Sequence, residues 1–162
     1  VRFNATLLRP AWPAEAMPRP SAKVRFAEVE PGRSALMSRI RSSGTKPEIA
    51  VRRALHALGF RFRLHRRDLP GKPDIVLPKY RLAIFVHGCF WHAHTCPRGF
   101  KPKSNVEFWE DKFSKNRERD VRTLRKLRSL GWRCLTVWEC QLTDTAKLER
   151  RIRRFLETDT TP

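Results

Sequence analysis

Ten residues at positions 87–96, His-Gly-Cys-Phe-Trp-His-Ala-His-Thr-Cys, directly follow an apolar segment at positions 80–86. The apolar segment predicts a buried strand, so the polar run that follows it is expected at the edge of a sheet. The run holds three of the five histidines and two of the four cysteines, together with two adjacent aromatic residues. Metal ligands, a candidate base and flat side chains in one loop indicate a metal-dependent enzyme that acts on an aromatic, stacked substrate.

The charge of the chain narrows the class of substrate. Lys and Arg number 35 against 16 Asp and Glu, which gives a formal net charge of +19. Most of this charge lies beyond the first 30 residues, so it does not belong to a detachable basic tail. A balance of this kind is typical of nucleic-acid binding. A basic surface that only aids solubility is the alternative, although acidic residues serve solubility better.

The length of 162 residues is compatible with one domain. We expect a flexible Pro- and Arg-rich arm over residues 1–31, which either lies on DNA or has no role, and a single domain over residues 32–158. No apolar run approaches the roughly 20 residues that span a bilayer, and the patch at positions 5–8 is too short for a secretory signal. We therefore expect a cytoplasmic protein without a membrane partner, whose cysteines bind metal or are buried.

The pattern beyond position 34 predicts alternating helices and strands. Thr45-Lys-Pro-Glu48 is a capping box, which begins a helix that ends at Gly59. The elements predicted after it are a half-exposed strand at 60–64, strands at 74–77 and 80–86, a helix at 105–130 that breaks near 114–116, a strand at 132–138 and a helix from 144. The order α-β-β-β-α-β-α predicts an α/β sandwich with a mixed sheet.

Groups suited to phosphodiester hydrolysis lie at the ends of two of these strands. Asp74 opens one strand, and the next strand ends at Val86 and His87. Side by side, these ends would bring a carboxylate and a main-chain carbonyl to a cation such as Mg²⁺, which prefers oxygen ligands. His92 is a candidate general base, because imidazole groups titrate near neutral pH. His87 is either a second active-site group or a hydrogen-bonded loop residue.

Soft metal ligands form a second group, which consists of Cys89, His94, Cys96 and Cys140. The first three lie in one loop, and Cys140 follows the last predicted strand. A Cys₃His set is common in tetrahedral structural zinc sites. Buried free thiols are the alternative. Cys134 lies inside a predicted strand, where burial is its expected role.

A longer string of motifs runs through the chain: Leu69-Pro-Gly-Lys-Pro-Asp-Ile-Val76, Phe85-Val-His-Gly-Cys-Phe-Trp-His92, His94-x-Cys96, Glu107-Phe-Trp109, Lys115-Asn-x-Glu-Arg-Asp120, Gly131-Trp-Arg133 and Val137-Trp-Glu-Cys140. This string closely resembles the very-short-patch-repair (Vsr) DNA mismatch endonucleases. The resemblance extends from about position 34 to position 142. It implies a restriction-endonuclease-like, PD-(D/E)XK α/β fold, with an α-β-β-β-α-β core, a mixed sheet and a structural zinc site.

The resemblance also implies an activity. Members of this family nick one DNA strand 5′ to the thymine of a T:G mismatch, which arises when 5-methylcytosine is deaminated, and so start very short patch repair. The expected cofactors are a catalytic Mg²⁺ and a structural Zn²⁺. The expected partners are double-stranded DNA that contains the mismatch and other mismatch-repair proteins, and we expect the chain to act as a monomer.

Carried over position by position, the resemblance implies a role for each candidate residue. Asp74 and the carbonyl of Val86 would bind Mg²⁺, and His92 would be the base, with Glu48, His87 and Asp120 in support. Cys89, His94, Cys96 and Cys140 would bind zinc, and Met37, Phe90 and Trp91 would enter the DNA beside the mismatch. Core anchoring is the alternative role for the two aromatic residues, and the capping box alone is the alternative for Glu48.

One position departs from the family's pattern, because Val86 stands where the best-known members carry threonine. A main-chain carbonyl is unaffected by this change, whereas a required hydroxyl would be lost. Two alternative functions stay open at this point. One is a less selective or restriction-type Mg²⁺-dependent nuclease. The other is a zinc-stabilised DNA-binding module without catalysis, which would need neither Asp74 nor His92.

Overall fold

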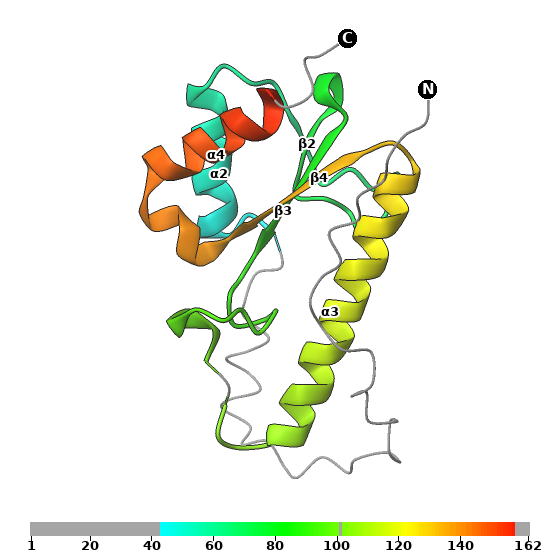
Figure 1. Cartoon of the computed structure of the whole chain (residues 1–162), viewed down its shortest axis with the longest axis vertical. Coiled ribbons are helices and arrows are strands. Elements are labelled where there is room, and N and C mark those ends of the chain that lie inside the picture. Colours follow the sequence, from blue (N-terminus) through cyan, green and yellow to red (C-terminus); the bar gives the residue numbers. More distant parts are fainter. Residues whose placement is uncertain (1–42, 101, 158–162) are drawn as a thin grey trace, which may run out of the picture.

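The helices and strands follow one another in the predicted order in a computed structural model that describes residues 43–100 and 102–157 (Figure 1). They are α2 (Lys46–Ala57), β1 (Arg63–Leu64), β2 (Ile75–Leu77), β3 (Leu82–His87), α3 (Val106–Ser129), β4 (Arg133–Trp138) and α4 (Thr145–Glu157). Short 3₁₀ turns η1 (Pro78–Tyr80), η2 (Pro97–Gly99) and η3 (Glu139–Thr143) connect them. The predicted arm at 1–31 and the candidate residue Met37 lie outside the described residues.

The four strands form one mixed sheet in the order β1-β2-β3-β4. Two antiparallel pairings join β1 to β2 and β2 to β3, while β3 and β4 are parallel and connected through α3. The last register pair of β3 and β4 is His87 with Trp138. The loop after β3 and the turn after β4 therefore leave the sheet at the same edge, which is where the two halves of the predicted zinc group meet.

Helices cover both faces of this sheet, with α2 and α4 together on one face and α3 on the other (Figure 1). Successive strand residues point to opposite faces. Ile75 and Leu77 accordingly pack with α2 and α4, whereas Val76 packs with Leu127 of α3. Among the described residues, every helix is too short or too polar to span a lipid bilayer.

The predicted helix starts agree with the structure. The Oγ1 of Thr45 accepts a hydrogen bond from the amide of Glu48, and the Glu48 carboxylate accepts one from the Thr45 amide, so both halves of the capping box are formed. Gly59 follows α2 with φ +79°, a conformation that glycine adopts without strain. The side chain of Asp144 accepts from the amide of Lys147 at 2.8 Å and so caps α4.

The predicted break at 114–116 was wrong, because α3 is one continuous helix of 24 residues. Serine and asparagine are poor helix formers, but each costs only about 0.5 kcal/mol, far less than proline. Ser114 donates to Glu118 one turn later, and Asn116 donates from Nδ2 to the carbonyl of Trp91 at 2.9 Å. Asn116, which the sequence suggested was part of a helix break, therefore ties the loop after β3 to α3.

The predicted strand at 60–64 was too long, because only Arg63 and Leu64 pair with β2. The amide of Phe60 donates instead to the carbonyl of Leu55, so this residue still belongs to the C-terminal turn of α2. Phe60 and Phe62 pack against the core as loop residues. The alternation of apolar and basic residues reflected a half-buried loop rather than a long strand.

Candidate active site and metal centre

Asp74 lies immediately before β2, next to the end of β3. Its Oδ2 accepts a hydrogen bond from the amide of Val86 at 2.7 Å, which places the carboxylate beside the main chain that carries the Val86 carbonyl. Burial raises the pKa of Asp74 above its ordinary value, and the Val86 amide partly opposes this effect. The two strand ends therefore lie side by side, as the sequence predicted. The Val86 side chain itself packs against the core shared with α2 and α4.

Two further side chains approach Asp74, one of which the sequence analysis had passed over. Ligand atoms of Glu48, His65 and Asp74 all lie within 4.8 Å of one another. Glu48 is only 3% exposed, and its Oε2 accepts from Arg52 Nη2 at 2.8 Å. The Nε2 of His65 lies 3.7 Å from the same Glu48 oxygen. The carboxylate of Glu48 therefore serves both the capping box and this group.

A second group consists of His87, His92 and Asp120. The Nδ1 of His92 is 2.5 Å from Oδ2 of Asp120, and the His87 Nδ1 is 4.0 Å from the same oxygen. An ionised carboxylate only accepts hydrogen bonds, so His92 donates from Nδ1, and Nε2 is the nitrogen that carries the lone pair in the neutral ring. The rings of His87 and His92 stack with centroids 3.8 Å apart. Burial and the nearby His92 lower the pKa of His87 to about 4, so His87 is neutral at physiological pH.

The four predicted soft ligands come together at the shared edge of β3 and β4. Ligand atoms of Cys89, His94, Cys96 and Cys140 lie within 4.8 Å of one another. Burial raises the pKa of Cys89 to about 12, while a hydrogen bond with the His94 side chain lowers that of Cys96 to about 6. Three thiols and an imidazole converging from two segments are the donor set of a tetrahedral zinc site. Cys134 lies half-buried within β4, apart from this group.

Backbone contacts hold the loop in the shape that this group needs. The amide of His94 donates to the carbonyl of Cys89 at 2.9 Å, and that of Gly99 donates to the carbonyl of Cys96 at 2.8 Å. A Cβ at Gly99 would lie 1.8 Å from the carbonyl oxygen of His94, so any other residue would force the loop apart. The ring of His94 stacks on Trp138, with centroids 4.2 Å apart.

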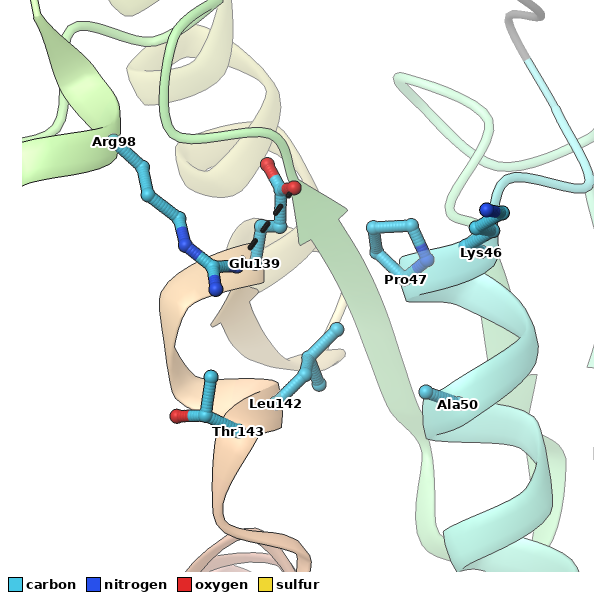
Figure 2. A pocket seen from close by; sticks show the side chains of 7 residues that line it. All are labelled: Lys46, Pro47, Ala50, Arg98, Glu139, Leu142 and Thr143. Carbon is cyan, nitrogen blue, oxygen red and sulfur yellow. Dashed lines mark ion pairs between the residues drawn. The ribbon is translucent and has the colours of Figure 1, made fainter.

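A pocket of about 220 Å³ lies between the N-terminal turn of α2 and η3, beside the cysteine group (Figure 2). Arg98 and Glu139 face each other across one side of it, with Nη1 and Oε1 3.9 Å apart. This ion pair joins the turn after Cys96 to the residue before Cys140. Among the described residues, the candidate catalytic and zinc-binding side chains lie outside the lining of this pocket. The pocket therefore lies beside the candidate metal centre and not within it.

Phe90 and Trp91 take different places in a cluster of aromatic rings. The ring of Phe90 lies 5.1 to 5.7 Å from those of Trp91, Phe100, Trp109 and Phe113. Trp91 contacts fewer rings, and the ammonium group of Lys112 lies 5.4 Å from its centroid. Both side chains remain partly exposed. Phe90 is therefore more firmly packed in the aromatic cluster, whereas Trp91 makes fewer contacts with other rings.

Comparisons with known proteins identify the family to which the chain is similar. Residues 29–98 match the family model described as DNA mismatch endonuclease Vsr. The type II nicking enzyme V.XorIIP of Xanthomonas oryzae pv. oryzae is 53% identical over 122 residues, which cover 75% of this chain and 90% of that protein. The DNA mismatch endonuclease Vsr of Escherichia coli is 44% identical over 124 residues, which cover 73% and 80% of the two chains.

The chain belongs to the Vsr family. Identity of this level over most of both proteins confirms the resemblance drawn from the sequence motifs. The catalytic domain of the homing endonuclease I-Bth0305I is also similar, with 27% identity, a TM-score of 0.49, and coverage of 69% of this chain and 94% of that one. Membership of the Vsr family argues against a DNA-binding module without catalysis.

Proposed function

We propose that this Vsr-family chain nicks one strand of duplex DNA 5′ to the thymine of a T:G mismatch. The observation that carries the proposal is the His92–Asp120 pair, in which a carboxylate 2.5 Å from Nδ1 leaves the opposite ring nitrogen free to accept a proton. His92 lies in the loop that begins where β3 ends, and its partner Asp120 lies on α3. The carboxylate of Asp74 lies beside the same end of β3. A general base and a metal-binding carboxylate are the two parts that metal-assisted phosphodiester hydrolysis requires.

The residues have distinct roles in this proposal. The carboxylate of Asp74 and the carbonyl of Val86 would bind Mg²⁺, with Glu48 in support, because a hard cation takes oxygen ligands. Bound Mg²⁺ would offset the charge that builds up on the scissile phosphate. The Nε2 of His92 accepts a proton from the attacking water, and the carboxylate of Asp120 orients the ring and stabilises the imidazolium. Neutral His87 stacks on His92 and limits its rotation.

We further propose that Cys89, His94, Cys96 and Cys140 bind a structural Zn²⁺. Their donor set fits zinc, since thiolate and imidazole are its usual ligands in closed four-coordinate sites. Zinc at this position would fix both ends of the loop that carries His92. The base would then be held by the metal centre on one side and by Asp120 of α3 on the other.

The decisive experiment compares duplexes that differ only in one base opposite a thymine. We expect Mg²⁺-dependent nicking of the T:G duplex at least about 100-fold faster than that of the T:A duplex, because a mismatched base costs less to unstack. Several flanking sequences should be tested, since the sequence context comes from groove contacts and DNA shape. Equal cleavage of both duplexes would favour the less selective nuclease, and no cleavage at all would overturn the proposal.

Trp91 gives a separate test of mismatch recognition. We expect Trp91→Ala to keep its fold and zinc but to lose about 10-fold or more of the T:G to T:A cleavage ratio, because a wedge side chain exploits the cheaper unstacking of a mismatch. Phe90→Ala is the matched comparison. Since the Phe90 ring contacts four others, its removal should chiefly lower the free energy of unfolding, by about 2 to 3 kcal/mol.

Thermal unfolding, zinc content and both cleavage rates would be measured on each variant. A folded Trp91→Ala protein with an unchanged cleavage ratio would remove the wedge from the mechanism. If the Trp91→Ala variant is unfolded, Trp91 is instead a residue of the hydrophobic core.

A further inference from the structure

His65 places an imidazole nitrogen close to the carboxylates of Glu48 and Asp74. Its Nε2 lies 3.1 Å from Nη2 of Arg52. A guanidinium group only donates hydrogen bonds, so the Nε2 of His65 is the acceptor, and the same nitrogen lies 3.7 Å from Oε2 of Glu48. Ligand atoms of Glu48, His65 and Asp74 lie within 4.8 Å of one another. One imidazole nitrogen therefore accompanies the carboxylate oxygens at the proposed cation site.

The backbone holds His65 in this orientation at a cost. Its φ is +45°, in the left-handed region that residues with a Cβ seldom adopt. The residue directly follows the β1–β2 pairing, where Leu64 faces Ile75, and its amide lies 3.3 Å from the carbonyl of Asp74. A residue with a Cβ in this region costs about 1 kcal/mol. The conformation fixes the imidazole beside the main chain of the metal-binding aspartate.

We propose that His65 is a nitrogen ligand of the catalytic cation and makes this site prefer Mn²⁺ to Mg²⁺. The inference rests on the proposed function, in which Asp74 binds that cation. Imidazole binds first-row transition ions well, whereas Mg²⁺ favours oxygen ligands and keeps its waters. A set of carboxylate oxygens with one imidazole nitrogen therefore favours Mn²⁺, and it leaves other positions of an octahedral ion for water and a phosphate oxygen.

The positively charged guanidinium of Arg52 contacts the same side chains that the proposed cation would bind. Its Nη2 donates to Glu48 at 2.8 Å and to His65 at 3.1 Å, so a cation that binds both must displace this contact. The Arg52 side chain also lines a shallow groove on the outer side of α2, together with Arg53 and His56. In this proposal the guanidinium turns toward the groove when the cation binds. Arg52 thus neutralises Glu48 until the cation arrives, and it lowers the affinity of the site for weakly bound ions.

The inference is tested by Mn²⁺ binding to the purified 162-residue chain without DNA. Loss of the free Mn²⁺ electron paramagnetic resonance signal gives the affinity, and competition with Mg²⁺ gives the preference. His65→Gln should weaken Mn²⁺ binding by at least about 10-fold, as loss of groups at metal sites commonly does, and should change Mg²⁺ binding less than about 2-fold. His56→Gln is the matched control, since His56 is an exposed histidine of α2 and should bind both ions as the wild type does.

A spectroscopic signature makes the test independent of variant stability. Electron spin-echo modulation from a ¹⁴N nucleus coordinated to Mn²⁺ should appear in the wild type and in His56→Gln and should be absent from His65→Gln. No such modulation in the wild type, or its persistence in His65→Gln, would overturn the inference. Nicking of T:G duplexes is assayed separately with Mg²⁺. Failure of that assay with the nitrogen signal intact would count against the proposed function and leave the ligand assignment standing.

Discussion

Asp74→Asn should reduce Mg²⁺-dependent nicking of a T:G duplex about 1,000-fold or more. A cation at a phosphoryl centre contributes several kcal/mol of transition-state stabilisation, and each 1.36 kcal/mol is about a factor of ten in rate. The asparagine oxygen can still accept the hydrogen bond from the Val86 amide, which spans 2.7 Å in the wild type. The strand ends should therefore stay together, and the affinity for the duplex in the absence of Mg²⁺ should change little.

Asp68→Asn is the matched control on the same segment. The Asp68 side chain is 58% exposed and pairs with Arg66, outside the candidate site. This variant should nick at the wild-type rate. Single-turnover rates measured for both variants would check the prediction, and undiminished nicking by Asp74→Asn would withdraw Asp74 from catalysis.

The second large effect concerns the cysteine group. We expect one Zn²⁺ per chain in the wild type and none in Cys140→Ser, because the remaining ligands all lie in one loop and no longer close a four-coordinate site. Zinc binding is coupled to folding. If its loss costs about 4 kcal/mol, the melting temperature of a chain of this size should fall by about 10 °C. Nicking should fall as well, since His92 lies between Cys89 and His94 in the sequence.

Cys134→Ser separates metal loss from the mere loss of a thiol. Cys134 is half-buried in β4, and its Sγ lies 3.8 Å from the carbonyl of Trp132. This variant should keep its zinc and show at most a small change in melting temperature. Zinc content by mass spectrometry and thermal unfolding would check both variants. A zinc-free wild-type protein of full stability would instead support the alternative of buried free thiols.

Local patterns in the sequence predicted much of the fold because each acts over a few residues. The Thr45–Glu48 capping box begins α2 where the sequence placed its start, and Gly59 follows the helix with the expected positive φ. Asp74 and Val86 could be placed side by side because both border strands that form a tight hairpin. The cysteine group could be predicted because three of its members share one loop and a fourth follows the adjacent parallel strand.

Errors arose where a tertiary contact outweighed a local preference. The predicted break of α3 ignored that Asn116 has a partner, the carbonyl of Trp91, which lies 25 positions earlier in the chain. The strand predicted at 60–64 alternates correctly, yet its first residue, Phe60, remains hydrogen-bonded to the end of α2. In both cases the propensity difference is less than about 1 kcal/mol per residue, so one long-range hydrogen bond or a packing contact reverses it.

The sequence by itself determined the order of the elements, the two candidate metal groups and the membership of a nuclease family. These depend on short-range spacing and on the chemistry of the side chains. Only the tertiary structure decided two further contacts between elements. It brought His65 of the loop after β1 to Glu48 of α2, and it placed Asp120 of α3 on His92. Such meetings depend on how helices pack on the sheet and on a left-handed backbone at His65, and no local pattern encodes either one.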